Sequence, residues 1–496
     1  MMNIELEKDS KEGLYSNYFK KGTFQHNTGD TIKLLPFNTQ YSKYGKDCKS
    51  DFSLFQGIVG ECFRISNNKQ FNKELTKDKE SSFKTKLKKH ILEESVNKVD
   101  TEHSEDFKEV VINLFFEEDG SLIKFNKKML SYMHFINEPA ILKETSKFFY
   151  EIFLNTKILN NKDLVSSEND NLFYKLIIDS LPKLEDKPLL KISRKYTNVF
   201  DEITTLFLND FNILSNREEL FLEHIEDLFK YYYFFYLSQT AINLNKFGKY
   251  KKVKPIYFSM NWETLSETRR SYNFGWKHVL FDLENLFSHA NTIELLNYIS
   301  INNEKIGDYE SIVNHCKTLS ADEINILISK IKELSEFYKP QIESLKSPFK
   351  AGKNWLDCEN SLSTKLNGKK FDTEIQIEMY SLFYRIDYQF INSTRDKPYK
   401  DYSNWLIEFF KSNYTKFRGR LGYTSAIDQE TLLFLTKICI EDKEKIRLKS
   451  LWDKLEQRGI SFDETSKVEI VKLFERINLL EKKSDSGDAQ YVKSII

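Results

Sequence analysis

"IRLKSLWDKLEQRGISFDETSKVEIVKLFERINLL" (residues 446–480) decides the fold of the C-terminal part of the chain. In its first half, apolar residues recur with the spacing of one helix face, at Leu448, Leu451, Trp452 and Leu455. Gly459 ends this helix, because a glycine just past a helix end readily takes the left-handed backbone conformation. Asp463 is a preferred N-cap and begins the next helix, whose apolar face is formed by Ile470, Leu473, Phe474 and Ile477. The segment therefore predicts two short helices joined by a tight connector.

The flanking segments add a helix before this pair and a hairpin after it. Upstream, Asp428 is expected to cap a helix over "QETLLFLTKICI" (residues 429–440). Downstream, "NLLEKKSDSGDAQYVKSII" (residues 478–496) places two short strand-like runs around an acidic Ser-Gly corner at Asp485–Asp488, which predicts a hairpin. Three short helices and a hairpin are typical of a winged helix-turn-helix, with the hairpin as the wing.

The predicted fold class is mainly α, because 16 Gly and 8 Pro in 496 residues are too few for a fold built on many tight turns. The expected architecture is a multi-domain helical body with a small α+β region at the N-terminus and the winged helix-turn-helix at the C-terminus. Its parts are a small N-terminal region with a hairpin turning at Thr28-Gly29-Asp30 (residues 1–66), a charged helix or connector without a core of its own (67–105), a helical body (106–318), a second helical block with a basic extension (319–424) and the winged helix-turn-helix (425–496).

Two local features support the helical assignment. Ser320 and Glu323 are spaced as a capping box at the start of the second block. The most apolar stretch, Leu228–Leu244, contains Lys230, Gln239 and Asn243 and is short for a membrane span, so it predicts a buried core helix and no membrane.

The composition indicates a folded, cytoplasmic protein. The formal net charge is zero, so any polyanion must be bound through local patches. The 5 cysteines are scattered and form no C-x-x-C pair, which favours thiols in a reducing cytosol over disulfides or a zinc site. The first residues are charged and contain no apolar signal segment.

Two acid-free windows are candidate DNA contacts, because Lys and Arg neutralise phosphates and aromatic rings stack on bases. "KSNYTKFRGRLGY" (residues 411–423) precedes the winged module and contributes Lys416, Arg418 and Arg420. "KFGKYKKVK" (residues 246–254) contributes Lys249, Lys251 and Lys252, although a solvated loop is slightly favoured for this window because lysine is abundant throughout the chain. Within the winged module, the candidates are Arg447, Lys472, Arg476, Lys482 and Lys483.

The exposed face of the third helix does not distinguish a DNA partner from a protein partner. Opposite the apolar stripe lie Thr465, Val468, Lys472, Glu475 and Arg476, which form a mixed face and not a basic one. On charge alone, this face suits a protein partner as well as DNA.

Catalytic motifs are missing from the sequence. There is no phosphate-binding G-x-x-x-x-G-K-[ST] loop, no G-x-G-x-x-G, no G-x-S-x-G and no H-E-x-x-H. His278 and Asp282 are four residues apart on an expected helix, with His289 further on, but a surface hydrogen bond is favoured over a metal site. We therefore expect a protein that is not an enzyme and has no catalytic residues, cofactor or metal.

Four segments of the chain resemble the DptG family. They are "GDTIKLLPFNT" (residues 29–39), "LFFEEDGSLIKFNKKMLSYMHFINE" (114–138), "LFLTKICIEDKEKIRLKSLWDKLEQRGISFD" (433–463) and "NLLEKKSDSGDAQYVKSI" (478–495). Members of this family are subunits of the bacterial restriction complex linked to DNA phosphorothioation. The resemblance implies a place in a three-protein assembly that attacks DNA lacking sulfur in its backbone. It also implies that the ATPase and helicase-like activities belong to the partner subunits, and it assigns no catalytic residues to this chain.

The sequence thus predicts a non-catalytic subunit that binds or positions double-stranded DNA in an anti-phage restriction complex. One alternative is a protein–protein adaptor whose winged helix docks a partner ATPase or nuclease subunit. A second alternative is a nuclease whose site the sequence does not reveal.

Overall fold

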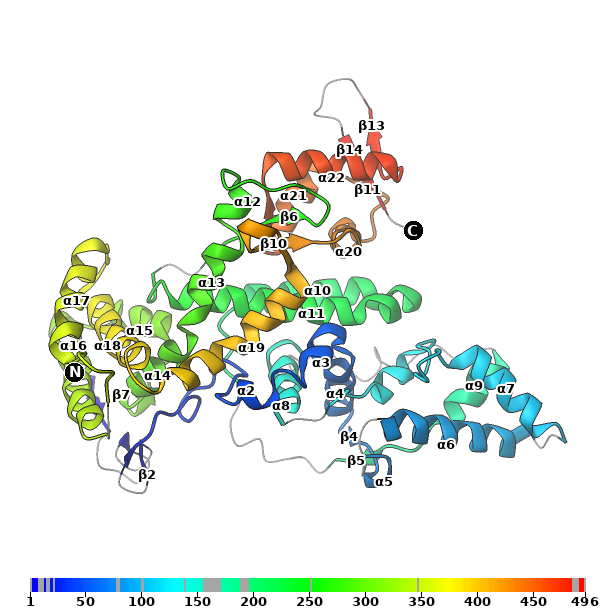
Figure 1. Cartoon of the computed structure of the whole chain (residues 1–496), viewed down its shortest axis with the longest axis horizontal. Helices are drawn as coiled ribbons and strands as arrows, with labels where there is room; N and C mark the ends of the chain where they lie inside the picture. Colours follow the sequence, from blue (N-terminus) through cyan, green and yellow to red (C-terminus); the bar gives the residue numbers. More distant parts are fainter. Residues whose placement is uncertain are drawn as a thin grey trace.

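Helix α11 (Glu218–Leu244) lies at the centre of the molecule (Figure 1). Nearly every side chain from Leu228 to Leu244 is buried, so the expected core helix is confirmed. Its aromatic run packs against neighbours on several sides, including Phe149, which stacks on Phe229 with ring centroids 4.2 Å apart. Among the described residues, no helix is both long and apolar enough to span a bilayer.

The computed structural model describes residues 2–7, 13–14, 18–20, 23–76, 81–99, 102–137, 140–154, 171–187, 196–249, 252–345, 348–483 and 490–494. Helices dominate these residues and the sheets are small, which confirms the mainly α class. One continuous apolar core extends from Ile4 to Val492, across most of the predicted boundaries.

The C-terminal elements follow the predicted order. They are α20 (Gln429–Ile440), β11 (Lys445–Arg447), α21 (Leu448–Gln457), β12 (Ile460–Phe462), α22 (Glu464–Arg476), β13 (Leu480–Lys482) and β14 (Gln490–Lys493). Asp428 and Asp463 cap α20 and α22 as expected, each accepting a backbone N–H with its side chain. Gly459 has φ +81°, and a Cβ there would lie 2.4 Å from Phe235 of α11, so this connector is pressed against the central helix. The expected turn at Asp485–Asp488 lies outside the described residues.

A four-stranded sheet that the sequence did not predict ties this region to earlier segments. Its order is β12–β6–β10–β9, with β6 (Ile256–Met260), β10 (Tyr423–Ile427) and β9 (Thr415–Phe417). β6 is parallel to both β12 and β10, and β9 and β10 form an antiparallel hairpin. The connector between α21 and α22 is therefore an edge strand of a sheet shared with the helical body.

The other helices of this part of the chain are α10 (Asp201–Ser215), α12 (Arg270–Asn273), α13 (Trp276–Glu284), α14 (Leu286–Leu296), α15 (Tyr309–Cys316), α16 (Ala321–Glu343), α17 (Trp355–Gly368), α18 (Glu374–Ile391) and α19 (Asp396–Tyr414). Among them, α10, α13 and α19 pack against α11. The capping box of Ser320 and Glu323 at the start of α16 is confirmed. Figure 1 shows the C-terminal elements on one side of α10 and α11, and α16 to α18 at one end of the molecule.

The N-terminal region is built into the body. Strand β1 (Ile4–Leu6) pairs with β7 (Ile299–Ile301), which also pairs with β8 (Glu304–Lys305). The helices of this region are α2 (Tyr41–Tyr44), α3 (Lys49–Leu54) and α4 (Gln56–Ser66).

The predicted N-terminal hairpin is present but displaced. It joins β2 (Phe19–Lys20) to β3 (Thr23–Phe24), so the prediction of a turn at Thr28-Gly29-Asp30 is wrong. The physical reason is the carboxylate of Glu294, which accepts the backbone N–H groups of Asp30 and Thr31 and holds this corner against α14.

A second, smaller core lies at the other end of the molecule. It is formed by α5 (Lys73–Thr76), α6 (Ser81–Val99), α7 (Ser104–Phe115) and α9 (Leu172–Asp179). The other elements of this part of the chain are β4 (Lys69–Gln70), η1 (Lys127–Tyr132), α8 (Ala140–Phe149), η2 (Tyr150–Leu154) and β5 (Glu185–Asp186), of which α8 and η2 pack in the main core. The charged segment was expected to be a helix or connector without a core of its own; Phe83, Leu87 and Ile91 of α6 are buried in a core that α6 shares with α7 and α9. These buried residues form a narrow apolar stripe along α6, and the lysines of α6 lie on the rest of its surface.

Candidate nucleic-acid interface

The β9–β10 hairpin contains the basic window next to the C-terminal elements, and its two arginines behave differently. Arg418 donates from Nε to Thr424 Oγ1 (3.0 Å) and from Nη2 to Ser259 Oγ (3.2 Å) and the Met260 carbonyl (2.9 Å). Its Nη1 donates to the carbonyl of Glu263. Burial lowers the pKa of Arg418, in spite of the nearby Glu263. Arg418 is thus occupied in holding the hairpin to the end of β6.

Arg420 is exposed at the tip of the same hairpin. Gly419 (φ +55°) and Gly422 (φ +69°) flank it and form the tight turn. Among the described residues, no carboxylate forms an ion pair with Arg420, so its guanidinium is available to a phosphate. Lys416 is also exposed, and its ammonium contacts the Asn261 carbonyl at 2.5 Å.

Exposed aromatic rings accompany these cations. Phe417 is 61% exposed and Tyr423 44% exposed, and their rings meet edge to face with centroids 5.3 Å apart. Lys411 lies over the Tyr423 ring at 5.5 Å. A free edge strand with cations and flat rings is a surface on which a nucleic-acid strand could lie.

The start of α22 is fixed by an internal ionic network. Arg269 donates to both carboxylate oxygens of Asp463, at 3.1 and 2.5 Å, and Ser271 donates its hydroxyl to the same carboxylate at 2.8 Å. Burial would raise the pKa of Asp463, but the hydrogen bonds from Arg269, Ser466 and Ser271 outweigh it and hold this pKa well below its usual range. The N-cap of α22 is therefore anchored to the segment that follows β6.

The rest of α22 presents the mixed face that the sequence predicted. Thr465, Val468, Lys472, Glu475 and Arg476 are all exposed. Lys472 pairs with Glu469 at 2.8 Å within the helix. Val468 is 52% exposed, which places an apolar side chain in the middle of the charged face.

The predicted wing is a three-stranded sheet in the order β11–β14–β13. Lys482, at the end of β13, pairs with Glu475 of α22 at 2.5 Å. Lys483 lies over the ring of Tyr491 at 5.4 Å. Arg447 is exposed on β11 opposite Tyr491 of β14, and no carboxylate of the described residues pairs with it.

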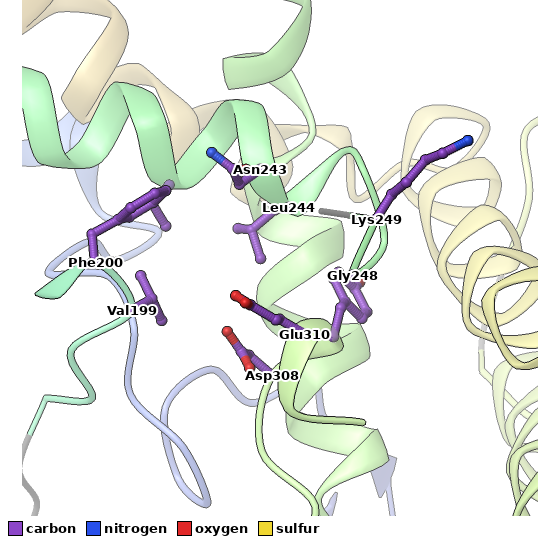
Figure 2. A pocket seen from close by; sticks show the side chains of 10 residues that line it. Val199, Phe200, Asn243, Leu244, Gly248, Lys249, Asp308 and Glu310 are labelled. Atoms are coloured by element: carbon purple, nitrogen blue, oxygen red, sulfur yellow. The ribbon is translucent and has the colours of Figure 1, made fainter. Parts of the chain in front are cut away.

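The other basic window lies elsewhere. Lys249 pairs with Asp372 at 3.1 Å, beside α18, and Figure 2 shows its side chain directed away from the small cavity next to it. That cavity, of about 30 Å³, holds no more than a water molecule. Lys252 is exposed beside a groove lined by α10 and α21, and Lys251 lies outside the described residues.

The structure therefore groups some candidates and separates others. The hairpin of Lys416, Arg418 and Arg420 and the start of α22 lie at opposite edges of one sheet, about 14 Å apart by strand spacing. Lys249 belongs to a different surface. Sequence reasoning overlooked Arg269, although the Arg269-Arg270 pair was a visible basic signal in the segment after β6.

Comparisons with known proteins give no relative: no protein-family model matches the chain, and no curated protein matches it either. Within the described residues, no group of three or more His, Cys, Asp or Glu side chains is arranged to hold a metal ion. His278, one of the residues considered for such a site, contacts Lys254 instead, and His289 is stacked on Phe383.

Proposed function

We propose that the chain is a non-catalytic DNA-binding subunit of a restriction complex of the DptG type. The observation that carries this proposal is the element order α20, β11, α21, β12, α22, β13, β14, with β11 beside the final hairpin, because three short helices followed by a hairpin are typical of a winged helix-turn-helix. The complex would act on DNA that lacks phosphorothioate, and its ATPase and helicase-like subunits would be the protein partners, as the resemblance implies.

The contact with duplex DNA would be made through the phosphates. Exposed cations without a carboxylate partner among the described residues include Arg420 on the hairpin, Arg447 and Lys483 beside Tyr491, and Arg476 on α22. Cations of this kind position a duplex without reading its sequence. We therefore expect affinity that depends weakly on sequence and strongly on salt.

A protein–protein adaptor is the second candidate, and one observation favours it. Two cations of the α22 face are paired, Lys472 with Glu469 and Lys482 with Glu475, while Val468 is exposed one turn before Lys472. A face with balanced charge and a central apolar residue suits a protein partner.

The DNA-binding subunit and the protein–protein adaptor are distinguished by measuring how the affinity of the purified full-length chain for a labelled duplex depends on salt. Release of counterions from about four phosphate contacts gives a slope of about −3 to −4 in a plot of log affinity against log salt. A flat plot, or no binding at low salt combined with stable capture of a partner subunit, would establish the adaptor. Incubation with ATP or with plasmid DNA and Mg²⁺ or Mn²⁺ tests the nuclease alternative, and we expect no turnover and no nicking.

A further inference from the structure

A surface pocket of about 380 Å³ lies at the beginning of β6, between α12, α13 and α21. Its walls include Lys254, Tyr257, Arg270, Phe274, His278 and Glu456. The pocket is separate from the β9–β10 hairpin and the wing, because none of the exposed cations assigned above to duplex DNA lines it. Its volume is within the range of small-ligand sites.

Arg270 is an exposed guanidinium held by aromatic rings. Its centre lies 4.6 Å above the Tyr257 ring and 6.0 Å from the Phe274 ring. No carboxylate of the described residues pairs with it, in contrast to its neighbour Arg269, which binds Asp463 and Glu263. An arginine that is stacked but not neutralised keeps its N–H groups for an anion.

A second cation faces the same pocket. The ammonium of Lys254 lies 2.7 Å from His278 Nε2. Because an ammonium group can only donate, the imidazole must be neutral and accept at Nε2. Burial and the adjacent Lys254 both lower the pKa of His278, in agreement with this assignment. The hydrogen-bond partner of the Lys254 ammonium is thus a ring nitrogen and not a carboxylate.

One acidic side chain lines the pocket, and one of its two carboxylate oxygens accepts a hydrogen bond. Glu456 accepts the hydroxyl of Ser461 at Oε1, at 3.0 Å. The charged side chains that line the pocket are therefore two cations and one carboxylate. Phe274 is 47% exposed at the same site, so a flat apolar surface lies beside the charge.

We propose that this pocket binds a nucleotide, with the phosphate held by Lys254 and Arg270 and the base packed on Phe274. A cation pair alone would suit any small anion, but the exposed ring next to it fits an anion that carries a planar group. The ligand is either a free nucleotide or the phosphorylated end of a single strand. This site is independent of the duplex contacts proposed above.

The test uses the full-length chain and two probes, dAMP and a 5′-phosphorylated single-stranded hexanucleotide, measured by calorimetry. We expect saturable binding of one or both, and loss of about tenfold or more in affinity for Arg270→Gln and for Lys254→Gln, because each removes a charged hydrogen-bond donor. Phe274→Leu should weaken both probes but leave the weak binding of inorganic phosphate unchanged.

Matched controls lie close by. Lys277→Gln removes the same charge from a lysine that sits over Tyr272 instead of in the pocket, and Phe281→Leu changes a 68% exposed ring on the same helix. Neither should alter the affinity. Tighter binding of the hexanucleotide than of dAMP identifies a strand end as the ligand, and equal binding identifies a free nucleotide.

Three results would overturn the proposal: no saturable binding of either probe, affinity that Arg270→Gln leaves unchanged, or inorganic phosphate binding as tightly as dAMP. Measuring duplex binding of the same variants shows whether the nucleotide pocket and the proposed duplex contacts are separate sites. Arg270→Gln should keep duplex affinity and salt slope, whereas Arg420→Ala should keep nucleotide affinity.

Discussion

Arg458, at the C-terminal end of α21, and Asp210 of α10 form a buried ion pair between the C-terminal elements and the helical body. The Nη2–Oδ1 distance is 2.5 Å and the Nε–Oδ2 distance 2.9 Å, and the two side chains are 3% and 0% exposed. Tyr232 of α11 donates its hydroxyl to the same carboxylate at 2.5 Å. The Arg458 carbonyl accepts a further hydrogen bond from Tyr231. The module is thus attached to the body by charge as well as by packing.

Removing one partner of this pair should destabilise the protein strongly. For Arg458→Met we expect a loss of about 3–5 kcal/mol in the free energy of unfolding, because Asp210 is left buried and unpaired. Urea denaturation followed by tryptophan fluorescence measures the change. The double variant Asp210→Leu with Arg458→Met should be more stable than either single variant.

The control for this prediction is an exposed pair. Lys472→Ala breaks the contact with Glu469 on the surface of α22 and should cost less than about 1 kcal/mol. If Arg458→Met were as mild as this control, the ion pair would not anchor the module.

Substituting the two arginines of the β9–β10 hairpin should have different effects, one on DNA binding and the other on stability. Arg420→Ala should leave the melting temperature unchanged and reduce the salt slope of duplex binding by about one. Arg418→Ala should lower the melting temperature, because it removes four hydrogen bonds that hold the hairpin to β6. Equal effects of both variants on the salt slope, with no change in stability, would contradict the internal role of Arg418.

Glu475→Gln tests which partner the face of α22 meets. Glu475 pairs with Lys482 of the wing, so the substitution frees a cation and removes a negative charge from the same spot. If DNA lies here, affinity should rise a few-fold and the salt slope should steepen by up to about one. Unchanged duplex affinity together with weakened capture of a partner subunit would assign the face to a protein.

The buried carboxyl of Asp282 should make the free energy of unfolding depend on pH. Burial raises the pKa of its carboxyl to about 6, although Lys254, Lys246 and Lys369 act in the opposite direction. Because the folded pKa lies above the unfolded one, the folded state is favoured at low pH, and this advantage is lost as the pH rises from about 4 to about 6.

Asp282→Asn should therefore stabilise the protein at pH 7.5, by about 1–3 kcal/mol, and have little effect near pH 4. Thermal melts across this pH range give the difference from the wild type. Glu267→Gln, at an exposed acid in the loop after β6, serves as the control and should show no such trend. If the stability of Asp282→Asn differed from that of the wild type by the same amount at all pH values, the difference would be caused by packing and not by ionisation of Asp282.

Local features of the fold could be predicted from the sequence. The caps at Ser320, Asp428 and Asp463 depend on contacts within one helical turn, and all three are as expected. The apolar face of α21 was likewise visible, because the helical spacing of Leu448, Leu451, Trp452 and Leu455 lies within one short window.

Features that depend on distant partners could not be predicted. "IYFSM" at β6 lies in a region of helical periodicity, and its role as a central strand is set by β10 and β12, far along the chain. The internal use of Arg418 was hidden for a similar reason. An acid-free window suggests a free cation, but the acceptors are backbone carbonyls of Met260 and Glu263, which no sequence pattern marks.

Strand β6 also has a consequence for how the protein is made. During synthesis β6 emerges well before its parallel partner strands, which contain Ile427 and Ile460 and lie far along the chain. Until then β6 has two open edges, and pairings between such distant segments form slowly. A nascent chain released before the last strands would expose this template to other chains, so truncated products should aggregate instead of accumulating as a folded body.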